Sequence, residues 1–436
     1  MGRPLDDDAV RRLDREHVWQ PFTAIGPARF DNTWPVIREA SGVWLTCTDG
    51  TRLLDACGSW WVSALGHGHP RVTAALHHQL DTLPHVILAQ TLHEPAALLA
   101  ARLAKVTPDG LERTFFTDNG STAVEVALRA SLQWHDQNGQ PERTTFLHLK
   151  HAYHGDTLGA VSTGGIDLFH GRLGRWGFRT VELPSPATDE ATALQALEDC
   201  LTRDGSTVAA LILEPLIQAA AGMRMYSTDY LRQARQLTDR AGVHLIVDEV
   251  FTGFGRTLEL FACGLAGISP DFLCLSKGLT GGVLPFGAMV TTDRIHSGFA
   301  GGTDRALLYG HSFAGNPMGC AAALAVLDAF EHDGVLEHAR SLQPELDAAV
   351  TDLSSIAGVH DVQRTGFVVR LQLGEHGSYG AKIGERVRER ALAHGLLLRP
   401  LGNVVYFVPA LTIRRTDLTW MFDRAKTVIR ECLDTP

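Results

Sequence analysis

Lysine is scarce in this sequence. Only five of the 39 basic residues are lysines, and the others are arginines. A chain that uses arginine wherever a positive charge suffices keeps a lysine for what arginine cannot do, chiefly losing its proton to become a nucleophilic amine. The remaining lysines are therefore candidates for chemistry, and they are Lys105, Lys150, Lys277, Lys382 and Lys426.

Other features that the chain lacks exclude several classes of protein. The seven cysteines are scattered and form no C-x-x-C pair, which predicts reduced, buried thiols in a reducing compartment. The N-terminus has no apolar signal region, and Glu214, Pro215 and Gln218 interrupt the most apolar run. A net charge of −10 without any basic run argues against nucleic acid. We expect a soluble cytoplasmic protein that binds neither membrane nor nucleic acid.

Short apolar runs alternate with amphipathic segments from about residue 72 to 320. This alternation predicts an α/β fold whose sheet is mostly parallel and is joined by crossover helices. The ends of such strands line one crevice, where ligands bind. Each predicted strand ends in a polar residue, and the strands are RTFFTD, TTFLHLK, VAALILE, VHLIVDE and DFLCLS, ending near Asp118, Lys150, Glu214, Asp248 and Lys277.

The segment after about residue 318 changes character. It predicts a helix, a pair of strands, a helix near 381–394, a hairpin in LLLRPLGNVVYFVPAL and a last helix from Asp417. Strands near the N-terminus can complete this α+β unit. We therefore predict a large domain over 55–319 and a small domain formed by 1–54 with 320–436.

Lys277 lies at the end of a predicted buried strand and is followed by glycines. Taken alone, it is more simply a lysine whose stem packs on the protein while its amine reaches solvent. Burial would instead lower its pKa and make it a nucleophile toward an aldehyde. The aldehyde cofactor pyridoxal 5′-phosphate needs such a lysine, a carboxylate at its ring nitrogen and a cup for its phosphate.

The chain offers the other two parts as well. Asp248 ends a buried strand expected beside the lysine strand, although a cap or an ion pair would also explain it. A phosphate site is predicted at Gly120 and Ser121, where a strand is followed by a tight turn and the start of a helix. Serine caps many helices, however, so this signal alone has an ordinary explanation. Tyr153 can stack on a flat ring. The histidines around it, and those in GHGHP, match no metal-ligand spacing, so we expect no metal.

With these residues in place, the chain resembles the class III aminotransferases, which have the fold-type I architecture of pyridoxal-phosphate enzymes. The resemblance extends over nearly the whole chain and includes LIVDEVFTGFGRT and SPDFLCLSKGLTGG. Within that class it is most similar to the enzymes of biotin synthesis that make 7,8-diaminononanoate. The stretches WQPFT, GSWW, AYHGDTLGAVS, YGHSFAGNP and LRPLGNVVYFVP favour that choice.

The resemblance implies a role for each matching residue. Lys277 would be the Schiff-base lysine and proton shuttle, Asp248 the partner of the ring nitrogen and Tyr153 a group against the ring. Its fold would have a seven-stranded, mostly parallel sheet in the large domain. The phosphate would be held by Gly120 and Ser121, and by His311 and Ser312 of the other subunit of a homodimer with shared active sites. The substrate contacts would be Phe22, Trp60, Trp61, Tyr153, Lys277, Gly310 and Arg399.

Arg399 would pair with the carboxylate of the substrate, 8-amino-7-oxononanoate, and the tryptophans would line its aliphatic tail. Arg399 could also be one surface arginine among many. Four positions depart from the family pattern: Phe22 replaces a frequent tyrosine, His311 and Ser312 replace Pro-Thr, and Leu258 replaces a glycine. Phe22 removes a hydroxyl near the amine, so either S-adenosylmethionine or lysine remains a candidate amino donor.

The expected reaction is a ping-pong transamination in which Lys277 moves the proton and Asp248 keeps the ring protonated. Another class III ω-aminotransferase, acting on ω-amino acids with pyruvate or on 4-aminobutyrate, is the nearest alternative. A non-catalytic binding protein that keeps the fold is an alternative of a different kind. It is disfavoured because every residue that the chemistry needs is present.

Overall fold

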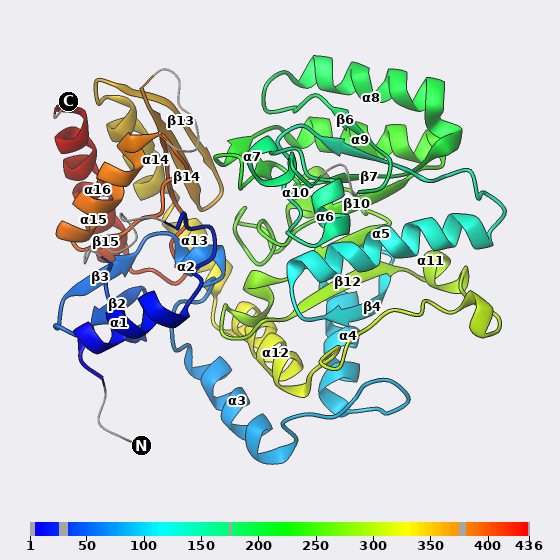
Figure 1. Ribbon diagram of the computed structural model, residues 1–436, viewed down its shortest axis with the longest axis horizontal. Helices are drawn as coiled ribbons and strands as arrows, with labels where there is room; N and C mark the ends of the chain where they lie inside the picture. Colours follow the sequence, from blue (N-terminus) through cyan, green and yellow to red (C-terminus); the bar gives the residue numbers. More distant parts are fainter. Residues whose placement is uncertain (1–4, 26–33, 174–176, 375–380, 435–436) are drawn as a thin grey trace.

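The computed structural model describes residues 5–25, 34–173, 177–374 and 381–434. Figure 1 shows a larger part built on a central sheet and a smaller part that carries both chain ends. The central sheet has seven strands in the order β4-β12-β11-β10-β7-β5-β6, with only β12 antiparallel to its neighbours. Their bounds are β4 Leu111–Thr117, β5 Thr145–Leu149, β6 Thr180–Leu183, β7 Val208–Leu213, β10 His244–Asp248, β11 Phe272–Leu275 and β12 Gly287–Thr292.

The middle strands are buried over their whole length, which suits a parallel sheet covered on both faces. Helix α5 contacts strands β4, β7, β10, β11 and β12, whereas α9 contacts β10, α8 contacts β6 and α9, and α10 packs on α9. Helix α12 packs on α3 and α4 below the sheet. The α-helices of the larger part, including three short ones not mentioned above, are α3 Pro70–Thr82, α4 Glu94–Val106, α5 Gly120–Gln137, α6 Leu158–Ser162, α7 Asp167–His170, α8 Glu190–Asp204, α9 Thr228–Ala241, α10 Ala262–Ala266, α11 Asp293–Ser297 and α12 Pro317–His332.

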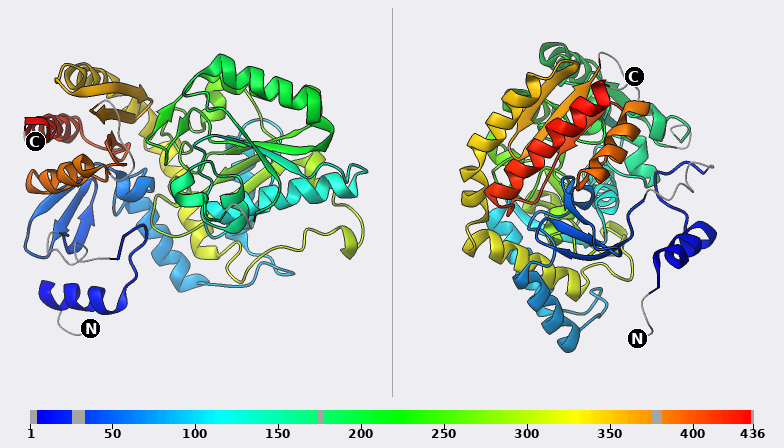
Figure 2. Two further views of the ribbon diagram at one scale, coloured as in Figure 1. Left: turned by 45° about the horizontal axis from the view of Figure 1, so that its top comes forward. Right: turned by 90° about the vertical axis from the view of Figure 1, so that its left-hand side faces the viewer.

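The smaller part combines segments from both ends of the chain, which lie side by side in both views of Figure 2. One of its sheets has the order β1-β2-β3-β15 and another the order β13-β14-β16. The strands are β1 Ile37–Ser41, β2 Trp44–Cys47, β3 Arg52–Asp55, β13 Val359–Thr365, β14 Val368–Leu373, β15 Leu396–Leu397 and β16 Val404–Phe407, and β8 Ile217–Gln218 pairs with β9 Arg224–Met225 elsewhere. The helices are α1 Asp7–His17, α2 Gly58–Trp61, α13 Val335–Ser341, α14 Gln343–Ser354, α15 Lys382–Ala393 and α16 Arg415–Asp434.

The α/β fold with a seven-stranded, mostly parallel sheet is confirmed. The predicted hairpin in LLLRPLGNVVYFVPAL is present only as its turn, where Leu401 and Val404 exchange backbone hydrogen bonds in one antiparallel bridge, and the flanking strands do not pair with each other. Its first strand, β15, runs parallel to β3, and its second, β16, pairs with β14. Asn403, in the turn, exchanges hydrogen bonds with Leu373 and so joins the second half to β14. The boundaries of the two domains remain a prediction.

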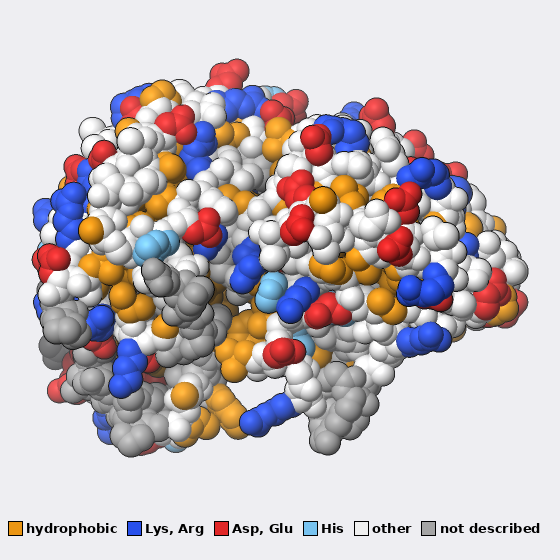
Figure 3. Space-filling model, turned by 90° about the horizontal axis from the view of Figure 1, so that it is seen from above, with side chains coloured by type: hydrophobic (Ala, Val, Ile, Leu, Met, Phe, Trp, Pro, Cys, Tyr) orange, Lys and Arg blue, Asp and Glu red, His pale blue; other side chains and the backbone are white. Residues whose placement is uncertain are grey.

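Among the described residues, every helix is too short or too polar to span a lipid bilayer. On the face shown in Figure 3, positive and negative side chains are interspersed. They do not gather there into a basic stripe of the kind that binds a phosphate backbone.

Candidate active site

A cavity of about 480 Å³ lies at the carboxyl ends of the middle strands. Of the five predicted strand-end residues, Glu214, Asp248 and Lys277 line it. Lys150 does not, because the chain turns after β5 and brings Tyr153 and His154 to the cavity in its place. Asp118 is not a lining residue either. The predicted convergence is therefore correct for three of the five positions.

Lys277 lies two residues after the end of β11 and lines the same cavity as Asp248, the last residue of the neighbouring strand β10. Strands β10 and β11 are adjacent and parallel, and in their register Asp248 lies opposite Cys274. The Lys277 amine lies 5.3 Å from the centre of the Trp61 ring. Burial lowers the pKa of Lys277, although Asp248 and Glu214 act to raise it. A lowered pKa increases the fraction of free amine, the form that reacts with an aldehyde.

Asp248 is held by a histidine that the sequence left without a role. Nδ1 of His154 lies 2.8 Å from Oδ2 of Asp248, and the two side chains are 0% and 6% exposed. The second oxygen, Oδ1, accepts a hydrogen bond from the backbone N–H of Val250 at 3.0 Å. A buried carboxylate needs such partners. Nε2 of His154 is buried and has no hydrogen-bond partner among the described residues.

Two further buried carboxylates differ in what they do. Glu214 accepts hydrogen bonds from the backbone N–H groups of Tyr153 and Ala219 and lines the cavity. Burial, partly offset by His154, raises the pKa of Glu214 to about 7. Glu249 instead accepts from backbone N–H groups at the start of α10 and from Thr252, away from the cavity lining. Glu249 is therefore a structural residue.

The first turn of α5 forms another wall of the cavity. Asn119 caps this helix with its side chain, which leaves Gly120 and Ser121 at the first helical positions, where N–H groups have no acceptor within the helix. A Cβ on Gly120 would come within 2.8 Å of Val250, and one on Gly155 within 2.0 Å of Ser121 Oγ. These glycines keep the backbone close around a site where N–H groups and the helix dipole favour an anion.

Tyr153 stacks on His170 at 5.8 Å between ring centres, with an angle of 14° between the planes. Its hydroxyl donates a hydrogen bond of 2.6 Å to Asp156. Burial and this bond raise the pKa of Tyr153, so its hydroxyl stays protonated. Asp156, which also lines the cavity, had not been singled out in the sequence.

The GSWW stretch forms a left-handed turn next to the cavity. The φ angles are 56° at Gly58, 45° at Ser59, 65° at Trp60 and 72° at Trp61. For a non-glycine residue such a conformation costs about 1 to 2 kcal/mol. Buried Arg256 donates hydrogen bonds of 3.5 Å and 3.2 Å to the carbonyl oxygens of Trp61 and Ser63, which anchor the end of the turn.

Arg399 lies over one of these tryptophans. Its guanidinium carbon is 3.8 Å from the centre of the Trp60 ring. The Phe22 ring meets Trp60 edge-on at 5.4 Å and Phe169 at 5.3 Å. An arginine stacked on indole keeps its N–H groups available in the ring plane. The structure therefore brings together Phe22, Trp60 and Arg399, which come from three distant segments.

The segment from Gly310 to Ser312 lies elsewhere in the single chain. With residues of the 87–97 segment, it lines a separate, mainly apolar cavity of about 850 Å³. His311 Nε2 is 3.6 Å from Asp118 Oδ1. The structure of one chain does not bring these residues to Lys277, so their predicted contact with the other subunit's phosphate stays a prediction.

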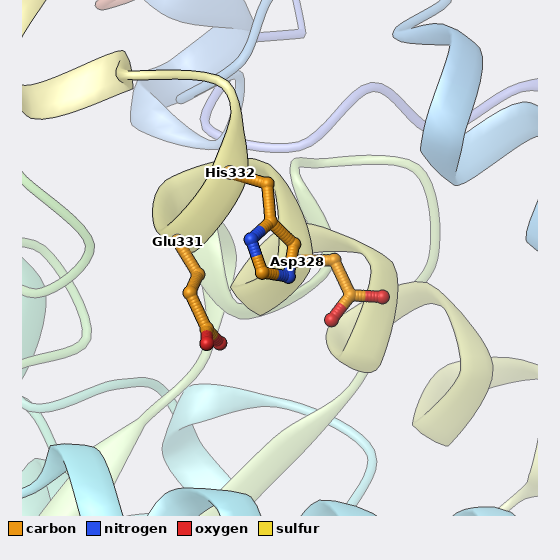
Figure 4. A group of neighbouring side chains, drawn as sticks. All are labelled: Asp328, Glu331 and His332. Carbon is orange, nitrogen blue, oxygen red and sulfur yellow. The ribbon is translucent and has the colours of Figure 1, made fainter.

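One side-chain group among the described residues has the spacing of metal ligands. Figure 4 shows Asp328, Glu331 and His332 together near the end of α12. Arg102 already pairs with both carboxylates, at 2.9 Å and 2.7 Å. The cluster therefore forms an ion-pair network on the surface.

The residues around the 480 Å³ cavity fit pyridoxal phosphate. They supply an amine of lowered pKa, a buried carboxylate held by His154, and a glycine-lined helix start for the phosphate. His154 lines this cavity, and its buried Nε2, without a partner among the described residues, is a polar atom that a ligand in the cavity can satisfy. His154 was visible in the sequence as one of three spaced histidines, but its pairing with Asp248, 94 residues away, was not.

Comparisons of the sequence with known proteins show the family of the chain. The sequence model for the family described as aminotransferase class-III matches residues 25–429. The chain is 38% identical over 439 residues to the adenosylmethionine-8-amino-7-oxononanoate aminotransferase of Geobacter sulfurreducens, with 96% of each protein covered. It is 44% identical over 417 residues to the enzyme of that name from Synechococcus elongatus, with 92% of this chain and 96% of that protein covered.

Solved structures give a similar picture. The crystal structure of the adenosylmethionine-8-amino-7-oxononanoate aminotransferase of Methanocaldococcus jannaschii superposes with a TM-score of 0.93 at 34% identity, covering 98% of this chain and 99% of that one. A PLP-bound amine transaminase from an uncultivated Pseudomonas species superposes with a TM-score of 0.87 at 31% identity, covering 95% and 98%.

Proposed function

The chain belongs to the class III aminotransferases, and from that premise we propose that it transfers an amino group to 8-amino-7-oxononanoate, giving 7,8-diaminononanoate in biotin synthesis. Its cofactor is pyridoxal phosphate. The observation that carries the choice of substrate is Arg399 stacked on Trp60, because this pair suits a long apolar chain that ends in a carboxylate.

Three groups of the chain would hold the cofactor. Lys277 would bind its aldehyde, Asp248 would face its ring nitrogen, and the N–H groups of Gly120 and Ser121 would take its phosphate. When bound, the cofactor supplies a carbonyl that receives the amino group and a ring that accepts electrons. His154 fixes the Asp248 carboxylate so that it can hold a proton on the ring nitrogen.

Lys277 acts as the base of the reaction. Its lowered pKa leaves Nζ free to take a proton from the carbon that carries the amino group of the donor. The same amine returns a proton to the keto carbon of the acceptor in the second half. The donor thereby becomes a ketone and the acceptor ketone becomes an amine, so hydrogen and nitrogen balance over the cycle.

Arg399 and Trp60 orient the acceptor. The guanidinium offers paired N–H donors to the terminal carboxylate, and the aromatic rings of Trp60 and Phe22 flank its stem. Phe22 has no hydroxyl to bind an amine. We propose S-adenosylmethionine as the donor, with lysine as the alternative that the experiment below distinguishes.

The active unit is proposed to be a homodimer. Gly310, His311 and Ser312 lie on the wall of an apolar cavity, and nothing from them reaches the Lys277 cavity of the same chain. A second copy that covers this wall would bring them to a neighbouring site and bury apolar surface. Sedimentation of the purified protein should therefore give twice the mass of the chain.

The function is tested by the first half-reaction. Purified protein loaded with pyridoxal phosphate is mixed separately with S-adenosylmethionine and with lysine, and the visible absorption of the bound cofactor is followed. S-adenosylmethionine should remove that absorption, and added 8-amino-7-oxononanoate should restore it. If only 4-aminobutyrate or another ω-amine removes the absorption, the proposed substrate is wrong and the chain is a different transaminase of the same class.

A further inference from the structure

The left-handed turn that carries Trp60 and Trp61 is closed by its own backbone. The N–H of Trp61 donates to the carbonyl of Cys57, and the N–H of Val62 donates to that of Gly58, both at 2.9 Å. The side chains at these positions disfavour positive φ. A turn of this kind persists only where its surroundings hold it.

Asp55 stabilises this turn through hydrogen bonds to Ser59. One oxygen of its carboxylate accepts a hydrogen bond from the Ser59 N–H at 2.9 Å, and the other accepts from the Ser59 hydroxyl at 2.7 Å. His67 Nε2 lies 3.0 Å from the second oxygen. Burial acts to raise the pKa of Asp55, but the hydrogen bonds from His67 and Ser59 outweigh it and the pKa is lowered. The carboxylate therefore stays charged at neutral pH.

Asp55 and His67, the two residues that bond to each other beside Ser59, are each held by backbone hydrogen bonds to the smaller part. Asp55 is the last residue of β3, and its N–H donates to the carbonyl of Val43 at 2.8 Å. His67 exchanges two backbone hydrogen bonds with Gly42, at 2.9 Å and 2.7 Å. Ser59, in the turn, is thus tied by one buried carboxylate to two rigid segments.

The turn in its left-handed form places both tryptophans. Trp60 stacks on Arg399 at 3.8 Å and meets Phe22 at 5.4 Å. Trp61 lies 5.3 Å from the Lys277 amine. A change to φ below zero at Ser59 would swing the Trp60 ring away from the guanidinium, because the side chains of successive residues are set by the backbone.

We propose that Asp55 is a positioning residue for the acceptor: by holding Ser59 in the left-handed turn, it keeps the Trp60 ring under Arg399 and so orients the guanidinium toward the substrate carboxylate. The kinetic consequence rests on the proposed function. The position of the Trp60 ring does not.

The kinetic experiment compares Asp55→Asn with the wild-type enzyme. Asparagine keeps the shape of the side chain, but one of its two polar atoms is a donor. It therefore cannot accept hydrogen bonds from the backbone N–H of Ser59, the hydroxyl of Ser59 and His67 at the same time. The KM for 8-amino-7-oxononanoate should rise about tenfold, as expected for loss of one ring–cation contact, while kcat stays within about twofold. Asp49→Asn, an exposed carboxylate in the turn before β3, is the matched control and should change neither constant.

The second experiment observes the ring itself. Protein loaded with pyridoxal phosphate is labelled with 5-fluorotryptophan, and the fluorine resonance of Trp60 is identified by its loss in Trp60→Phe. This resonance should shift or broaden in Asp55→Asn, less in Ser59→Ala, and not in Asp49→Asn. If Asp55→Asn does not fold, Ser59→Ala decides, because it leaves the carboxylate in place and removes only the hydroxyl, with its 2.7 Å bond to Asp55 and its 3.5 Å contact with His67.

Ser59→Gly introduces a residue that takes positive φ without cost. Combined with Asp55→Asn, it should recover part of the KM and of the Trp60 resonance. An unmoved resonance in Asp55→Asn, with or without loss of stability, contradicts the proposal. If the wild-type enzyme does not use the keto acid, the proposed function fails, and the resonance alone decides the role of Asp55.

Discussion

Glu214 carries a pH-dependent contribution to stability that can be measured without any substrate. Burial, partly offset by His154 and reinforced by Asp248, raises its pKa from 4.5 to about 7. The unfolded chain therefore releases this proton near pH 4.5, and the folded protein keeps it until about pH 7. The stability that the protonated carboxyl contributes is complete below pH 4.5 and is lost as the pH rises through about 7.

The size of this effect follows from the shift. Since one pKa unit corresponds to about 1.4 kcal/mol, ionised Glu214 lowers the free energy of unfolding by about 3 kcal/mol relative to the protonated form. Glu214→Gln has nearly the same shape and cannot ionise. The NH₂ group of the glutamine would face the backbone N–H of Tyr153 or of Ala219, so one hydrogen bond is lost. This loss lowers the free energy of unfolding by about 1 kcal/mol at every pH.

The assay is urea denaturation of both proteins at a series of pH values from 4.5 to 8. Relative to the wild-type protein, Glu214→Gln should gain about 3 kcal/mol over this range. Glu337→Gln, an exposed residue of α13, is the control and should show no such gain. A difference between Glu214→Gln and the wild-type protein that stays constant with pH would refute the reasoning.

Three other substitutions probe the site. Lys277→Ala should lower amino transfer by about a thousandfold or more, whereas Lys150→Arg, outside the cavity, should leave the rate unchanged; equal rates would contradict the role of Lys277. Arg399→Ala should raise the KM for the keto acid about tenfold to a hundredfold, and an unchanged KM would mean that another group binds its carboxylate. His154→Ala leaves Asp248 buried without its partner, so it should cost about 3 kcal/mol and lower the melting temperature by about 3 °C; an unchanged melting temperature would show that solvent replaces the imidazole.

The sequence predicted the parts of the fold that depend on local pattern. The buried strands that end at Asp248 and beside Lys277 are continuous apolar runs, and they lie side by side as expected. The hairpin prediction was correct only at the turn between Leu401 and Val404, because the two apolar segments beside it have partners far away, β3 and β14. Local hydrophobicity shows that a segment is a strand, but not which distant strand it joins.

The same limit applies to the candidate site. Lys277 stood out because the chain has so few lysines, whereas His154 and Asp55 act through partners that only the folded backbone brings near. The pattern of GSWW indicated an apolar wall. Nothing in it indicated positive φ at three non-glycine residues, since that conformation is imposed by Asp55, His67 and Arg256 from outside the turn.

The central claim is that this chain moves an amino group onto 8-amino-7-oxononanoate through Lys277. The most direct measurement supplies S-adenosylmethionine labelled with ¹⁵N in its amino group, together with the keto acid and pyridoxal phosphate, and analyses the product by mass spectrometry. The account predicts 7,8-diaminononanoate that carries the label with the wild-type protein, and its formation about a thousandfold or more slower with Lys277→Ala. Unlabelled product, or labelled product at the same rate from Lys277→Ala, would contradict it.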